Sequence, residues 1–150
     1  MSYIKECKRK LIKGFTLFEL LVSISIIGIL VAVASVSYSG AQKKARDARR
    51  KEDMGLIQKA AEQFYSQNNF SYPTSDTAPW APTSGTATLE VFPSDPKNDA
   101  TYYYSYSSSS PYSTYCACAR LDNATGNSND RSCNLIGTGN GQYYCVKNQQ

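Results

Sequence analysis

The sequence has no histidine among its 150 residues. Histidine is the commonest general base and a frequent metal ligand, so its absence excludes Ser-His-Asp, Cys-His and His-zinc sites. Proline is absent before Pro73, and charged side chains are absent between Leu20 and Gln42. The lack of proline allows one long helix. The lack of charge leaves an apolar run that a small domain has no room to bury on every face.

Charge is distributed unevenly along the chain. The 16 Lys and Arg residues outnumber the 12 Asp and Glu residues, which gives a net charge of +4. The first 14 residues hold five basic residues and one acid, so they account for the whole excess. Because the remainder is neutral, the basic balance does not indicate a nucleic-acid partner.

The apolar run spans residues 15–38 and contains one charged side chain, Glu19. A helix of about 20 such residues crosses the ~30 Å hydrocarbon core of a bilayer. A secretory signal peptide is the nearest alternative, because residues 32–34 (Ala-Val-Ala) offer a cleavage site before Ser35. A carboxylate inside the run costs about 2.5–3.5 kcal/mol near a helix centre. Glu19 therefore favours a retained membrane segment in which the carboxylate has a function.

The segment from Lys13 to Val22, KGFTLFELLV, resembles the class III signal of type IV prepilins and type II secretion pseudopilins. In that family a prepilin peptidase cuts after the glycine that ends a short basic leader and N-methylates the next residue. The resemblance implies cleavage after Gly14 and N-methylation of Phe15. It also implies that Glu19 is the carboxylate used in filament assembly.

The physical chemistry of Glu19 agrees with that role. Cleavage creates an α-amine at Phe15, and an amine and a carboxylate in low dielectric are far less costly as a pair than alone. Within one subunit the helix separates the two groups by about 6 Å along its axis, whereas a neighbour can approach more closely. We therefore expect Glu19 to pair with the Phe15 amine of a neighbouring subunit. The plainer alternative is a carboxylate that merely reaches interfacial water.

The same resemblance implies a structural subunit, either a minor pilin or a pseudopilin, with no catalytic activity of its own, and we expect no cofactor. Its implied partners are a prepilin peptidase, a polytopic platform protein, sister pilins and, indirectly, a cytoplasmic assembly ATPase. It would cross the inner membrane once before assembly and then enter an extracytoplasmic filament. The alternative from another class is a single-pass anchored binding or adhesive module. The sequence does not distinguish secretion, motility, adhesion and DNA uptake.

The helical pattern continues beyond the apolar run. Apolar side chains recur at positions i, i+3, i+7 and i+10 as Met54, Ile57, Ala61 and Phe64. This spacing predicts one helix from residue 15 to about residue 67, with weak points at Gly28, Gly40 and Gly55. Between the two apolar patterns lies a basic cluster of Lys43, Lys44, Arg46, Arg49, Arg50 and Lys51. It favours a solvated helix surface near lipid headgroups over subunit contacts, and a DNA-binding stripe ranks last because no aromatic residues are interleaved.

The C-terminal half changes from irregular to β in character. Residues 68–100 contain five prolines, and Trp80 and Phe92 are the expected packing anchors. Residues 92–98 resemble the proline-aspartate-proline turn of small pseudopilins, and strands are expected at 101–106, 112–120 and 142–147. The predicted class is α+β, a type IV pilin-like fold with a long N-terminal helix packed on a small antiparallel sheet. The expected divisions are a leader (1–14), a membrane or filament-core half-helix (15–40), an amphipathic half-helix (41–67) and a loop and sheet domain (68–150).

The sequence contains five cysteines. Cys7 would leave with the leader, and the even number that remains, Cys116, Cys118, Cys133 and Cys145, predicts two disulfides. Cys116 and Cys118 share a strand face and should not pair with each other. The nested pairing, Cys116–Cys145 with Cys118–Cys133, is favoured over the crossed pairing. Zinc fits poorly, because Cys-x-Cys lacks the usual ligand spacing.

One loop invites a metal hypothesis. Residues 121–132 could offer Ca²⁺ the side-chain oxygens of Asp122, Asn127, Asn129 and Asp130. Their order does not match an EF-hand loop, and a solvated turn is the favoured interpretation.

Overall fold

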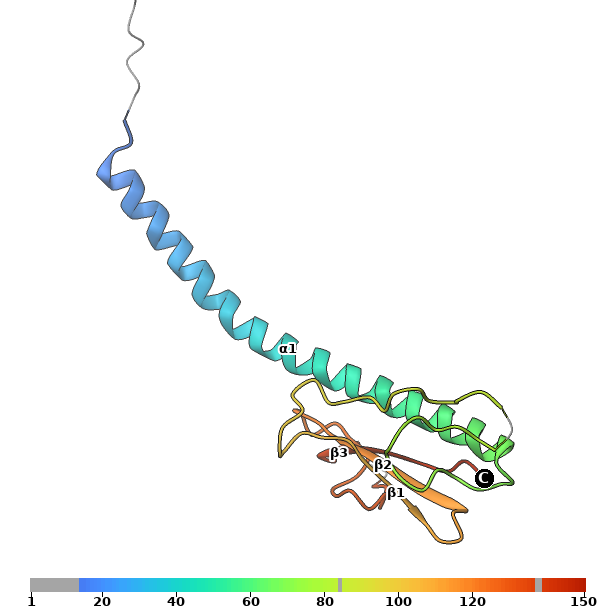
Figure 1. Cartoon of the computed structure of the whole chain (residues 1–150). Helices are drawn as coiled ribbons and strands as arrows, with labels where there is room; N and C mark the ends of the chain where they lie inside the picture. Colours follow the sequence, from blue (N-terminus) through green and yellow to red (C-terminus); the bar gives the residue numbers. More distant parts are fainter. Residues whose placement is uncertain (1–13, 84, 137–138) are drawn as a thin grey trace, which may run out of the picture. The chain divides into compact units, whose positions relative to one another are not determined.

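The computed structural model describes residues 14–83, 85–136 and 139–150. In these ranges one helix, α1 (Leu17–Gln67), precedes three strands, β1 (Ser105–Ser109), β2 (Thr114–Arg120) and β3 (Tyr143–Lys147), as Figure 1 shows. The predicted α+β class, with a long N-terminal helix and a small antiparallel sheet, is confirmed. The basic leader and Cys7 lie outside the described residues.

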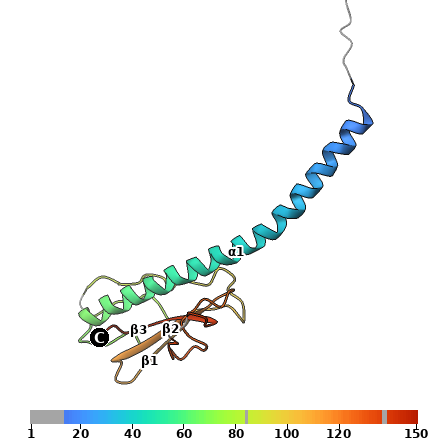
Figure 2. The ribbon, with the colours of Figure 1, turned by 180° about the vertical axis from the view of Figure 1, so that it is seen from behind.

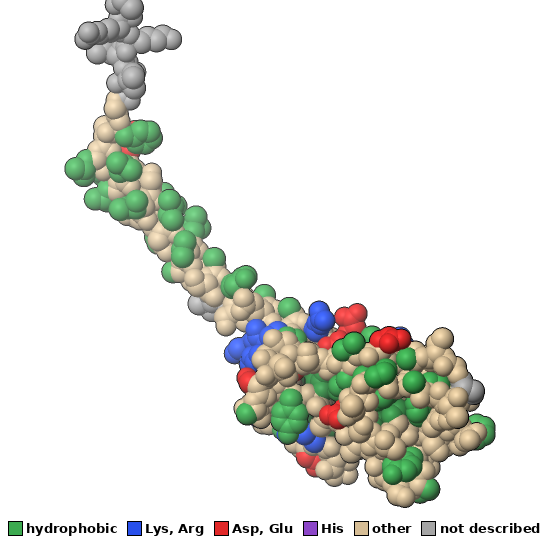
Figure 3. Space-filling view, in the orientation of Figure 1, with side chains coloured by type: hydrophobic (Ala, Val, Ile, Leu, Met, Phe, Trp, Pro, Cys, Tyr) green, Lys and Arg blue, Asp and Glu red, His purple; other side chains and the backbone are tan. Residues whose placement is uncertain are grey.

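The chain forms two units, one up to Ser39 and one from Gly40 to Gln150. In the first unit the helix carries exposed apolar side chains, and Figure 3 shows them along its visible face. Leu17 is 81% exposed and Leu30 is 63% exposed. By length and composition this helix is apolar enough to cross a membrane.

Serines within the apolar run satisfy their own hydroxyl groups. The hydroxyls of Ser23, Ser25 and Ser35 each donate, at 2.8 Å, to the backbone carbonyl four residues earlier. A hydroxyl in hydrocarbon has no water to bond, so this back-bonding removes the main cost of placing serine there. These three polar residues are therefore compatible with a membrane segment.

In the second unit the sheet has the order β1-β2-β3, with both pairs antiparallel. The first strand begins later than expected, because Ser105 pairs with Cys118 and Ser109 with Thr114. Ser107, Ser108 and Ser109, which lie between the first two expected strands, are thus part of β1. Cross-strand hydrogen bonding outweighs the weak strand preference of serine here.

One face of this sheet packs against the second half of α1, as Figure 2 shows from behind. The predicted helical stripe is confirmed: Met54, Ile57 and Ala61 are fully buried. From the sheet they meet Tyr115, Ala117, Ala119 and Val146. Small residues on β2 let the helix approach closely, and each large apolar side chain buried in this way stabilises the fold by about 1.5–3 kcal/mol.

Aromatic side chains fill the remainder of the core. Trp80 and Phe92 pack with ring centroids 5.8 Å apart, as expected of anchors for the irregular segment. Tyr106 stacks on Tyr115 at 5.6 Å, and Tyr115 meets Tyr72 at 4.7 Å. Tyr72 and Tyr115 are buried in the core, and Tyr106 is partly buried against it. Their burial argues against an adhesive tyrosine surface on this face.

The opposite sheet face carries two disulfides, Cys116–Cys133 and Cys118–Cys145. The nested pairing favoured from the sequence is therefore wrong. The register decides the matter, because Cys118 stands directly opposite Cys145, with Cα atoms 4.1 Å apart. Cys116 faces Lys147 instead, and a diagonal Cα separation of about 7–8 Å is too long for a Cys116–Cys145 bridge.

Candidate functional site

The first candidate site is the start of α1. The backbone N–H of Thr16 donates to Glu19 Oε2 at 2.9 Å, and the Thr16 hydroxyl donates to the same oxygen at 2.8 Å. In return the Glu19 N–H donates to Thr16 Oγ1 at 3.3 Å. This reciprocal arrangement is a capping box, with threonine at the N-cap and glutamate three residues later. It caps the helix, which begins at Leu17.

The capping box fixes the Glu19 carboxylate at the positive end of the helix dipole. Both hydrogen bonds from Thr16 end on Oε2, and among the residues that the structure describes no donor reaches Oε1. Phe15, directly before the cap, is 79% exposed. The arrangement thus presents one carboxylate oxygen that can accept a hydrogen bond from a cation outside the subunit.

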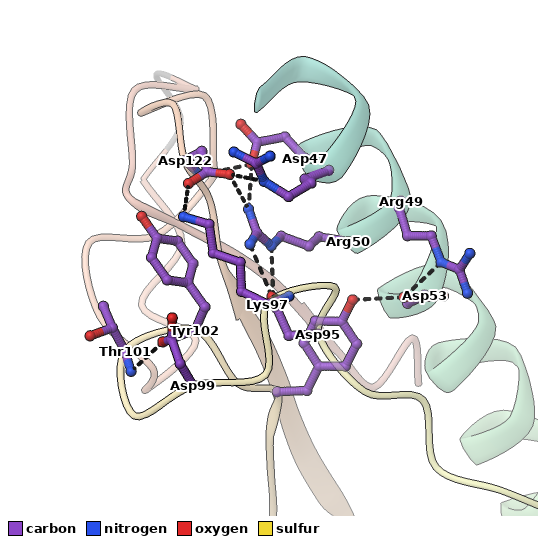
Figure 4. Close-up of polar contacts among 12 residues, drawn as sticks. Asp47, Arg49, Arg50, Asp53, Asp95, Lys97, Asp99, Thr101, Tyr102 and Asp122 are labelled. Atoms are coloured by element: carbon purple, nitrogen blue, oxygen red, sulfur yellow. Dashed lines mark hydrogen bonds and ion pairs between the residues drawn. The ribbon is translucent and has the colours of Figure 1, made fainter. Parts of the chain in front are cut away.

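The second candidate site is a buried ion-pair cluster in the second unit, drawn in Figure 4. At its centre Arg50 is fully buried. Its Nε and Nη2 donate to the two oxygens of Asp95 at 2.7 and 3.0 Å, a bidentate pair. Its Nη1 donates to Asp47 Oδ1 at 2.9 Å and to Asp122 Oδ2 at 3.0 Å. We use the term ion-pair cluster for Arg46, Asp47, Arg50, Asp95, Lys97 and Asp122.

Two further cations complete the charge balance. Arg46 Nε and Lys97 Nζ each lie 2.7 Å from a different oxygen of Asp122. Three cations therefore face three carboxylates, Asp47, Asp95 and Asp122. Buried charges are tolerable only when they are paired and hydrogen-bonded, and each carboxylate of this cluster accepts several hydrogen bonds.

The ion-pair cluster joins three separate parts of the chain. Asp47 accepts hydrogen bonds from the backbone N–H groups of Asp122 and Asn123 at 2.7 and 2.9 Å. Asp95, in the proline-flanked turn, accepts the Lys97 N–H at 2.8 Å. The cluster thus fixes the segment after β2 and the turn before β1 onto α1.

The ion pairs shift the pKa values of the acidic and basic groups in opposite directions. Burial would raise the pKa of Asp122, but hydrogen bonds from Lys97, Arg46 and Arg50 outweigh it and hold that pKa well below its usual range. Burial would lower the pKa of Arg50, but Asp95, Asp122 and Asp47 raise it above its ordinary value. Both groups are therefore charged at any physiological pH.

Beside the cluster, the hydroxyl of Tyr104 donates to Asp53 Oδ2 at 2.6 Å. Burial, and then this contact with a carboxylate, raise the pKa of Tyr104 above its ordinary value. Arg49 lies 3.8 Å from the same aspartate, but its side chain is 70% exposed. Tyr104 is therefore a fixed donor that anchors the segment before β1 to the helix.

The sequence did not reveal this cluster. Six basic residues after the apolar run favour a solvated surface, yet Arg50 is buried and Arg46 is only partly exposed. The available signal was the mixture of Asp47 and Asp53 among the arginines, together with the aspartate between two prolines. Buried ion pairs need both partners, and these partners stand 45 and 76 residues apart.

Most of the side chains considered as calcium ligands in residues 121–132 already bond to other groups of the protein. Asp122 is already bonded to three cations, and Asn127 exchanges two hydrogen bonds with the backbone of Cys145, at 2.7 and 2.8 Å. Two of the four candidate ligands thus hold the fold together. Asp130 likewise accepts the Ser132 N–H at 2.9 Å, so three of the four side chains are bonded to groups of the protein.

Comparison with known proteins addresses the first site. The family model for the prokaryotic N-terminal methylation motif matches residues 9–35, which include Gly14, Phe15, Thr16 and Glu19. No curated protein and no solved structure was found to match the chain.

The N-terminal segment thus carries the class III signal of type IV prepilins and pseudopilins. The match covers less than a fifth of the chain. The residues that the structure describes have a pilin-like α+β fold.

Proposed function

We propose that this chain is a structural subunit, a minor pilin or pseudopilin, of a type IV pilus-like or type II secretion filament. The observation that carries the proposal is the methylation motif, with Glu19 capping the helix that follows it. In this proposal a prepilin peptidase cuts after Gly14 and N-methylates Phe15. The new amine then lies next to the Thr16 cap.

In this proposal the second carboxylate oxygen of Glu19, Oε1, takes part in filament assembly. Oε2 caps its own helix, and Oε1 accepts the Phe15 amine of a neighbouring subunit. The pair is worth most in low dielectric, where each charge alone is costly. The exposed apolar side chains of residues 17–33 hold the subunit in the inner membrane and then pack with those of sister subunits in the filament core.

The expected divisions follow this scheme. Residues 1–14 are removed, 15–40 form the membrane and core half-helix, and 41–67 with 68–150 form the part outside the membrane. A platform protein and a cytoplasmic ATPase would drive assembly. The chain itself needs no cofactor, since its role is mechanical.

The test compares processing with incorporation. Intact mass should show a mature chain that begins with N-methylated Phe15, and a chain beginning at Ser35 would contradict the proposal. Glu19→Gln should be processed normally but be depleted from sheared filaments, because the neighbour's amine loses its counter-charge. The matched control is Glu52→Gln, an exposed glutamate on the same helix, which should assemble normally. Normal assembly of Glu19→Gln would refute the assembly role. If the processed chain never enters filaments, the anchored binding module becomes the better explanation.

A further inference from the structure

The two disulfides are unequal in exposure but adjacent in space. Cys118 and Cys145 are buried, at 0% and 2% exposure. Cys116 and Cys133 are only partly buried, and they line a groove of about 270 Å³ on the outer sheet face. A thiol in solution can therefore approach the Cys116–Cys133 bridge, whereas the Cys118–Cys145 bridge is shielded from it.

The sulfur atoms of the two bridges are in contact. Cys118 Sγ lies 3.5 Å from Cys116 Sγ and 3.9 Å from Cys133 Sγ. Thiol–disulfide exchange requires only that a thiolate reach a disulfide sulfur. Either cysteine of the exposed bridge, once freed, is already beside the buried bridge.

We propose that Cys116–Cys133 is a thiol–disulfide exchange site, through which a dithiol oxidoreductase controls the buried Cys118–Cys145 bridge. The groove walls suit such a partner, because they are polar and include Lys147. A nearby lysine stabilises a thiolate and so favours the exchange. The proposal does not depend on the filament role.

The first step is an ordinary reduction. A thiolate of the partner attacks Cys133 Sγ, the bond to Cys116 breaks, and its electron pair leaves on Cys116 Sγ, which takes up a proton. The partner's second thiolate then attacks the mixed disulfide and releases Cys133 as a thiolate. The partner is oxidised from dithiol to disulfide, and one bridge of this chain is reduced to two thiols.

The second step is internal and involves no net oxidation or reduction. The Cys133 thiolate attacks Cys118 Sγ, a Cys118–Cys133 bond forms, and the electron pair of the broken Cys118–Cys145 bond leaves on Cys145. Cys133 is the better attacker, because Cys116 and Cys118 are two residues apart on one strand. Their Cα spacing of about 6.6–6.8 Å is at the limit for a bridge. Run in reverse with a disulfide oxidant, the same steps close the buried bridge during folding.

The experiment follows the exchange by trapping. The mature full-length chain in detergent is exposed briefly to limiting dithiothreitol, quenched with acid and alkylated. Digestion with trypsin and chymotrypsin, followed by fragmentation mass spectrometry, then shows which cysteines carry the label. The proposal expects a species labelled at Cys116 and Cys145 but not at Cys133. If partly reduced chains carry label only at Cys116 and Cys133, the relay does not exist.

A variant gives an independent readout. In Cys116→Ser/Cys133→Ser the relay is absent, so reduction of Cys118–Cys145 should slow by about tenfold or more at equal dithiothreitol. If the two bridges were independent, removing the outer one would leave the inner rate unchanged or raise it, and that result would overturn the proposal. Circular dichroism checks that the variant folds. The trapping experiment on the unaltered chain decides the matter if the variant does not.

Discussion

Arg50 offers the sharpest test of the reasoning about the ion-pair cluster. Replacing it with methionine keeps an unbranched apolar stem but removes four hydrogen bonds to three carboxylates. The loss in the free energy of unfolding depends on which hydrogen-bond donors each carboxylate retains. Asp122 keeps Arg46 and Lys97, and Asp47 keeps its backbone donors.

Asp95 is the carboxylate that loses most when Arg50 is replaced. Its side chain is fully buried, and without Arg50 its one remaining donor is the Lys97 N–H at 2.8 Å, among the contacts of the described residues. Leaving a buried charge without its partner costs about 3–5 kcal/mol, a large share of the roughly 5–15 kcal/mol that stabilises a typical domain. We therefore expect Arg50→Met to destabilise the chain by about 3–5 kcal/mol.

The assay is urea denaturation of the full-length chain in detergent, followed by circular dichroism. The matched control is Arg49→Met, one residue earlier, whose exposed side chain lies 3.8 Å from Asp53 and should cost less than about 1 kcal/mol. Arg50→Met/Asp95→Asn should regain part of the loss, because the unpaired charge is removed. Equal losses for Arg49→Met and Arg50→Met would refute the reasoning.

Four further predictions concern single residues. Because the pKa of Asp122 is lowered by folding, the stability it contributes is present above about pH 4 and lost as the pH falls further. Asp122→Asn should flatten that acid limb in urea midpoints measured against pH, and an unchanged limb would contradict the assignment. Gly126→Ala should cost about 1–3 kcal/mol, since a Cβ would collide with the Tyr143 carbonyl. Gly55→Ala, where a Cβ meets nothing within 4 Å, should be neutral or stabilising by up to about 1 kcal/mol in the same denaturation assay. Thr16→Val should weaken the helix start by about 0.5–2 kcal/mol and speed amide hydrogen exchange in the first turn, whereas Thr16→Ser should not. Equal exchange in the two Thr16 variants would count against the capping box.

The sequence by itself determined the features that are local along the chain. The capping box needs only Thr16 and Glu19, which are three residues apart, one turn of helix. The apolar run and the stripe through Met54 and Ile57 follow from periodicity, which is a property of neighbouring positions. For the same reason the methylation motif, the helix and the fold class were all predictable without coordinates.

Only the tertiary structure decided which distant residues meet. The cysteine pairing depends on the register of β2 and β3, because a shift of two residues would exchange the partner of Cys145. Whether Arg50 faces solvent or the interior depends on Asp95, 45 residues away, and on the turn that brings it to the helix. Such contacts are fixed by packing and by balancing buried charge over the whole unit, and no local pattern encodes them.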